Sequence, residues 1–131
     1  MNAEEALLVW RLGLYLPICD DLRRAPWKGS PRATAGHCYV ASEVIYHALG
    51  GKAAGYTVWG TVHEGSQHWW LRTPLDRAAH SNEVIDPTWD QFDTPVPYES
   101  ARRRSFLTNH PSKRAVEMAR RAGITLKMEG D

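Results

Sequence analysis

The chain has 131 residues, of which 43% are hydrophobic, and its 16 lysines and arginines nearly balance its 15 aspartates and glutamates. This length and composition predict a single globular domain, 1–131, and the balanced charge argues against bulk nucleic acid as a partner for the whole surface. The first apolar stretch, 7–18, is interrupted by Arg11 and follows acidic residues, a pattern that fits neither a secretory signal nor a membrane span. We therefore predict a cytoplasmic protein in which Cys19 and Cys38 stay reduced.

The first half of the chain predicts two helices separated by a loop. Asn2 and Glu5 form an approximate capping box, and apolar residues follow at helical spacing as far as Pro17. The segment 25–36 contains two prolines and two glycines, which favour an irregular loop. From Cys38 onward, apolar residues recur on one face of a helix that two consecutive glycines end. Cys38 is thus predicted at the N-terminus of a helix.

The second half predicts mainly strands and one further helix. Segments 56–63 and 67–72 are rich in β-branched and aromatic residues around a glycine-containing turn, which predicts an antiparallel hairpin, and 83–86 predicts a short strand ended by proline. A helix is expected to begin at Pro111 and end at Gly123, with 124–128 as an edge strand. The residues that this helix is expected to turn inward are Ala115, Val116, Ala119 and Ala122. Together the elements predict an α+β domain with a central helix on a small antiparallel sheet.

Cys38 has the environment of a reactive thiol. Unpaired N–H groups and the helix dipole stabilise a thiolate on the first turn of a helix. The preceding Gly36 permits close approach of another group, and the backbone N–H of Cys38 is suited to an oxyanion hole. Such a thiolate needs a base, and His68 on the second hairpin strand meets this need. Asp86, at the end of the next strand, can orient the imidazole and stabilise its charged form.

Three segments carry a family resemblance: GHCYVASEVIYHALGG, QHWWL and VIDPTWDQF. Their order and spacing over residues 36–88 resemble the transglutaminase-like core of the papain-like cysteine enzyme superfamily. The resemblance implies a papain-like fold, a catalytic triad of Cys38, His68 and Asp86, and a cysteinyl thioester intermediate. It implies a thiol-dependent amide hydrolase or acyltransferase of peptidase, deamidase or transglutaminase type, acting on a peptide, protein or small amide. We expect no cofactor and no metal.

Several residues around this triad have open roles. Gln67 and Trp27 are candidates for the second oxyanion donor, and Trp59 and Trp70 are candidates for the wall of an acyl-substrate groove. His63 is the alternative base. His37 is expected to face solvent or to lend charge that lowers the pKa of the Cys38 thiol. His47, His80 and His110 are expected to be surface groups, and Cys19 is expected to be inert.

Two other functions compete with the enzyme. Cys38, His37, His63 and His68 could form a zinc-binding module, although their spacing matches no common zinc motif. A catalytically silent domain could instead hold an acidic partner through its arginine-rich C-terminal third. The strongest basic run there consists of Arg102, Arg103 and Arg104.

Overall fold

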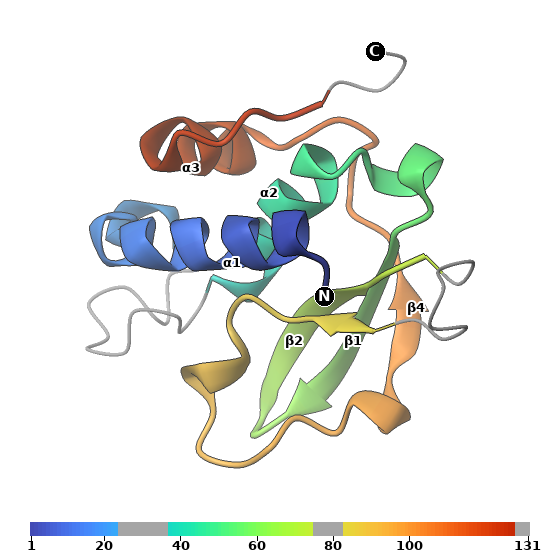
Figure 1. The fold of residues 1–131 in the computed structure, drawn as a ribbon. Helices are drawn as coiled ribbons and strands as arrows, with labels where there is room; N and C mark the ends of the chain where they lie inside the picture. The colour runs from blue at the N-terminus through green and yellow to red at the C-terminus, as the bar shows by residue number, and fades with distance from the viewer. Residues whose placement is uncertain (24–36, 75–82, 128–131) are drawn as a thin grey trace.

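A computed structural model describes residues 1–23, 37–74 and 83–127 of the chain. Over these ranges the protein is an α+β structure in which three helices cover one face of a four-stranded antiparallel sheet (Figure 1). No helix in the described ranges is long and apolar enough to cross a membrane.

The sheet has the strand order β3-β2-β1-β4, and its centre is the hairpin of β1 (Thr57–His63) and β2 (Ser66–Arg72). The predicted hairpin is therefore confirmed, and Gly65 adopts the left-handed conformation in its turn. On one edge, β3 (Val84–Ile85) pairs with β2, and on the other edge β4 (Arg102–Arg104) pairs with β1.

The edge strand predicted over 124–128 is wrong for the described residues 124–127, which form no strand. These residues follow the helix end instead, because the N–H of Ile124 bonds to Ala119 and that of Lys127 bonds to His47, both through carbonyl oxygens. The edge position belongs to β4, whose arginines gave no strand signal in the sequence. Charged side chains are common on edge strands because they discourage pairing with another chain.

The three helices begin and end close to the predicted positions. Helix α1 (Ala3–Tyr15) has the Asn2–Glu5 capping box, α2 (Cys38–Ala48) begins at the predicted cysteine, and α3 (Lys113–Ala122) ends at Gly123 in the left-handed conformation. Ser112, rather than Pro111, caps α3 by accepting a hydrogen bond from the Ala115 N–H. Glu43 in α2 accepts two further bonds from Ser112, each of 2.7 Å, and so ties the two helices together.

The core lies between the three helices and the helix-facing side of the sheet. Its fully buried members include Leu12 of α1, Ile45 of α2, Leu71 of β2 and Met118 of α3. Val116 was predicted to face this core but is 51% exposed. Helical geometry explains the error, because Ala115, Met118, Ala119 and Ala122 already fill the inward face of α3 at spacings of three and four residues.

The segment 86–101 covers the opposite face of the sheet. It leaves β3 at one edge, passes through short 3-10 turns at Trp89–Gln91 and Tyr98–Ser100, and enters β4 at the other edge (Figure 1). The Glu64 carboxylate in the hairpin turn anchors this segment by accepting a 2.8 Å bond from the Thr94 N–H. This crossing encloses the side chains that project from β2 on the face away from the helices.

Candidate active site

The N-terminus of α2 places Cys38 against the sheet. Cys38 is the first helical residue and His37 is the N-cap. The expectation that His37 faces solvent is wrong, since the residue is fully buried and its Nε2 lies 3.1 Å from the Cys19 carbonyl oxygen. This bond fixes the start of α2 against the turn that follows α1. His37 therefore positions the cysteine rather than contributing charge at the surface.

The short length of β3 leaves room for α2 at the edge of β2. Strand β3 pairs with β2 only at Leu71 and Arg72. Farther along the same edge, the first turns of α2 approach the β2 backbone: Cys38 Sγ lies 3.6 Å from the Gln67 carbonyl oxygen, and Ser42 Oγ donates to the Trp69 carbonyl oxygen at 3.1 Å. These contacts place the thiol beside the backbone that carries His68.

His68 and Asp86 form a close buried pair. His68 is fully buried, and its Nε2 lies 2.6 Å from Oδ2 of Asp86, which is 8% exposed. A neutral His68 therefore carries its proton on Nε2 and donates it to the carboxylate, so that Nδ1 remains available. Nδ1 is buried and has no hydrogen-bond partner among the described residues.

Asp86 is itself held by two further donors. Its Oδ1 accepts a 3.2 Å bond from the Thr88 N–H, and its Oδ2 accepts a 2.8 Å bond from the Tyr98 hydroxyl. Burial raises the pKa of Tyr98, and the neighbouring Asp86 carboxylate raises it further, so the phenol stays protonated and keeps donating. These bonds hold the carboxylate in place for the imidazole.

Aromatic rings surround His68. Trp70, its neighbour on the same face of β2, has its ring centroid 5.6 Å away, and Phe92 of the crossing segment approaches edge-on at 4.7 Å. Trp70 in turn packs against Tyr98 at 5.0 Å. The rings exclude water and leave the imidazole few alternative orientations.

The local environment favours the charged form of His68. Burial alone lowers its pKa, but the hydrogen bond to Asp86, the interaction with the Cys38 side chain and the charges of both partners together raise the pKa to about 9. Cys38 Sγ lies 3.6 Å from the carbonyl oxygen of Gln67, the residue before His68, and Nδ1 is the ring nitrogen that Asp86 leaves available. The structure thus brings all three predicted residues together.

The predicted accessory residues have different positions. Trp70 is fully buried beneath His68, so it supports the imidazole and does not line an open groove. Trp59 lies on β1, away from the α2 edge of β2, where its Nε1 donates to the Thr57 hydroxyl at 2.8 Å. The Gln67 side chain is exposed and accepts a 3.1 Å bond from Arg104, while Trp27 lies outside the described residues.

The other histidines and Cys19 are separate from this group. His63 Nε2 lies 3.2 Å from the Thr94 carbonyl oxygen, so it is engaged at the hairpin end rather than with the thiol. His47 was expected at the surface, but it is only 6% exposed and packs near the end of α2, whereas His110 is exposed as predicted and His80 lies outside the described residues. Cys19 is fully buried, and burial raises its pKa, which agrees with an inert thiol.

The zinc-module alternative is not supported by the described ranges. Among these residues no group of three or more His, Cys, Asp or Glu side chains could hold a metal ion. His37 and His63, two of the proposed ligands, hydrogen-bond to different carbonyl oxygens in different parts of the molecule.

Tyr98 and Phe92 are the residues of this site that sequence reasoning missed. Both lie in the segment 86–101, whose prolines and polar residues indicate only a loop. Nothing in their local sequence predicts contact with Asp86 or His68, because that contact depends on the path of the segment across the sheet.

Comparison with known proteins leaves the site geometry as the guide to function. The chain matches no protein-family model, no curated protein and no solved structure.

Proposed function

We propose that this protein is a thiol-dependent amide hydrolase or acyltransferase of papain-like, transglutaminase-like type. Cys38 is the nucleophile, His68 the general base and acid, and Asp86 the residue that orients and charges the imidazole. The observation that carries the proposal is the buried 2.6 Å contact between His68 and Asp86, formed where the first turn of α2 brings a thiol to the imidazole.

The chemistry follows from these positions. With its pKa raised to about 9, His68 holds the proton of the pair on Nδ1, which gives a Cys38 thiolate and an imidazolium that Asp86 stabilises through Nε2. The thiolate attacks the carbonyl carbon of an amide. The imidazolium then protonates the leaving nitrogen, the C–N bond breaks, and a thioester and a free amine or ammonia result. Water gives the carboxylic acid, or a second amine gives a new amide, and the thiol is restored.

The oxyanion formed during this attack needs hydrogen-bond donors. As the first residue of α2, Cys38 has a backbone N–H that makes no hydrogen bond within the helix, and the helix dipole adds positive potential there. We assign this N–H as one donor. The Gln67 amide remains a candidate second donor, although its oxygen is bonded to Arg104.

Selective alkylation tests the proposal. Iodoacetamide is added to the protein between pH 5 and 8, and the modified cysteine is identified by peptide mass analysis. We expect Cys38 to react faster than Cys19 by about 100-fold or more at pH 6, because the imidazolium stabilises only the Cys38 thiolate. His68→Ala should remove this advantage, and His110→Ala, at an exposed histidine, should not.

Turnover is measured in parallel. A set of glutaminyl and asparaginyl dipeptide amides is incubated with the protein and hydroxylamine, and the released ammonia and the hydroxamate are quantified. Cys38→Ala should abolish both products. If both cysteines of the folded protein are alkylated at the same rate, and His68→Ala leaves the Cys38 rate unchanged, the proposal that the protein is a thiol enzyme is refuted.

A further inference from the structure

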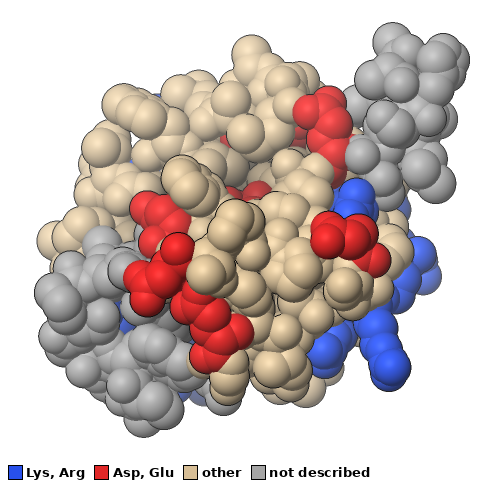
Figure 2. Space-filling view, turned by 90° about the horizontal axis from the view of Figure 1, so that it is seen from below, with Lys and Arg blue, Asp and Glu red and all other residues tan. Residues whose placement is uncertain are grey.

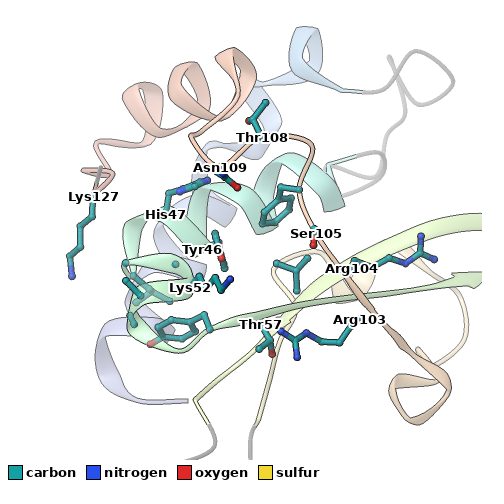
Figure 3. Close-up of a pocket in the computed structure, with 18 residues that line it drawn as sticks. Tyr46, His47, Lys52, Thr57, Arg103, Arg104, Ser105, Thr108, Asn109 and Lys127 are labelled. Atoms are coloured by element: carbon teal, nitrogen blue, oxygen red, sulfur yellow. The ribbon is translucent and has the colours of Figure 1, made fainter. Parts of the chain in front are cut away.

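A second candidate site lies at the other end of α2. A hollow of about 440 Å³ is bounded by the end of α2, the 3-10 turn Gly51–Ala54, the start of β1, the segment 103–109 and Lys127 (Figure 3). Cys38, His68 and Asp86 do not line it. The eleven residue steps from Cys38 to Leu49 correspond to about 16 Å along a helix, so the hollow is separate from the proposed thiol site.

The described lining of this hollow is positively charged. It contains Lys52, Arg103, Arg104 and Lys127 and includes no aspartate or glutamate. Lys52, Arg103 and Lys127 also form no ion pair with any described residue. Figure 2 shows Lys and Arg side chains at the edge where Figure 1 places β4, with some Asp and Glu side chains beside them and a larger group of Asp and Glu toward the opposite edge. A concave surface whose charged side chains are all positive attracts and concentrates anions.

The two β4 arginines that line the hollow have different roles. Arg104 points away from the hollow in Figure 3, lies over the Trp69 ring and bonds to Gln67. Arg103 lies beside Thr57 and is held over the Trp59 ring, with its guanidinium carbon 5.8 Å from the ring centroid. This stacking orients the Arg103 side chain but leaves its hydrogen-bond donors available for a ligand.

Aromatic and hydroxyl groups complete the hollow. In Figure 3 the side chains of Tyr46 and Lys52 lie near its middle, and Thr108 and Asn109 lie along its upper rim. Tyr46 packs edge-on against Phe106, at 5.3 Å between ring centroids. A ligand here would therefore meet ring faces or edges as well as cations and neutral hydrogen-bonding groups.

Backbone contacts fix the shape of the hollow before any ligand binds. The Lys127 N–H donates to the His47 carbonyl oxygen at 3.0 Å, which attaches the C-terminal segment to the end of α2. On the other side, Arg103 pairs with Trp59 in the β4–β1 ladder. Because both walls are attached to regular structure, binding requires little ordering of the chain.

We propose that this hollow binds a small phosphate ester with a planar ring, of the size and chemistry of a nucleoside monophosphate. Lys52 and Arg103 bind the phosphate, which carries between one and two negative charges near neutral pH. The Lys127 side chain points away from the hollow in Figure 3 and adds only to its positive potential. The ring packs beside Tyr46 and Phe106. The volume lies within the range of pockets for small organic ligands and is too large for an isolated phosphate to fill.

Calorimetric titration and NMR mapping test this site with AMP, adenosine and inorganic phosphate as the probes. We expect AMP to bind more tightly than either adenosine or phosphate by about tenfold or more. Adenosine lacks the phosphate that the cations bind, and inorganic phosphate lacks the ring that packs beside Tyr46 and Phe106. AMP should shift the amide signals of residues 51–58 and 103–109. Lys52→Gln and Arg103→Gln should each weaken AMP binding about tenfold, which is the effect of losing one charged hydrogen bond.

Arg102→Gln is the matched control. Arg102 is exposed on the same strand and carries the same charge, but it does not line the hollow. This variant should keep AMP affinity within about twofold at 0.15 M salt, where distant exposed charges are largely screened. No AMP binding at millimolar concentration, equal binding of adenosine, or equal losses in Arg102→Gln and Arg103→Gln would each overturn the proposal. Circular dichroism of every variant confirms that the fold is retained.

Discussion

The two ends of α2 differ in how their charges are arranged. At the N-terminal end, Cys38 meets a buried imidazole that already has a carboxylate partner 2.6 Å away. At the C-terminal end, Lys52 and Lys127 border a hollow whose described lining has no acidic residue. The helix dipole favours a negative group at the first end and cations at the second. One helix can therefore support an anionic nucleophile at one end and a cationic binding surface at the other.

The degree of burial also separates the two ends. His68 is fully buried among aromatic rings, so its protonation depends on a few fixed partners. Lys52 and Arg103 are exposed, so their charges act through solvent and depend on ionic strength. Changes at the N-terminal end should therefore have large effects on pKa and stability, and single changes at the C-terminal end should affect mainly ligand binding.

The largest expected effect comes from Asp86→Asn. This change keeps the shape of the side chain but removes the charge that helps raise the pKa of His68 to about 9. Without this charge the imidazolium is less favoured and the imidazole is no longer held in its orientation, so we expect the alkylation rate of Cys38 at pH 8 to fall by about tenfold or more. Asp90→Asn, at an exposed nearby position, is the control. A wild-type rate in folded Asp86→Asn would remove Asp86 from the mechanism.

The second prediction concerns the stability of the protein against pH. The folded pKa of His68, about 9, lies above its unfolded value of 6.5, so the folded state binds more protons between these two values. The stabilisation is complete below pH 6.5 and is lost as the pH rises through about 9. Urea unfolding should show a loss on the order of 3 kcal/mol over this range that is missing in His68→Gln. The same pH dependence in both proteins would contradict the raised pKa, and His110→Gln should behave as wild type.

The positions of Cys38, His68 and Asp86 near the N-terminal end of α2 could be predicted because they depend on local sequence signals. The capping residues before α1, the glycine-containing turn between β1 and β2 and the apolar face of α2 each act within a few residues. Once the hairpin and α2 are in place, Cys38 and His68 lie on neighbouring elements. Asp86 follows because β3 extends the hairpin by one more antiparallel strand.

Long-range packing determines what could not be predicted. The burial of His37 depends on the Cys19 carbonyl group, and the contact of Tyr98 with Asp86 depends on a chain crossing that leaves no local pattern. The strand at Arg102–Arg104 has no apolar alternation because it is an edge strand with exposed arginines. The C-terminal hollow draws its lining from three distant parts of the chain, 46–58, 103–109 and Lys127, so no single motif could indicate it.

Tyr98→Phe tests how much the hydrogen bond from Tyr98 to Asp86 contributes to the stability of the protein and to the reactivity of Cys38. The change removes one hydrogen bond to the Asp86 carboxylate and leaves the aromatic contact with Trp70. Because a bond to a charged group contributes about 1.5–3 kcal/mol, we expect a loss of about 2 kcal/mol in the free energy of unfolding. The Cys38 alkylation rate should change less than in Asp86→Asn, since the carboxylate charge remains. As a control, Tyr15→Phe at an exposed tyrosine should change neither the stability nor the alkylation rate. If Tyr98→Phe loses no stability, water replaces the hydrogen bond to Asp86.

The smallest effects are expected when a change at one end of α2 is measured at the other. Lys52→Gln removes an exposed charge from the turn after α2, whose end lies about 16 Å along the helix from Cys38. This separation exceeds the Debye length of about 8 Å at physiological salt. The Cys38 alkylation rate of this variant should therefore stay within about twofold of wild type. Conversely, Cys38→Ala should leave AMP binding unchanged in the same calorimetric titration. A change of about tenfold in either direction would mean that the rigid helix couples the two ends, and would make the hollow a regulatory site for the thiol rather than an independent one.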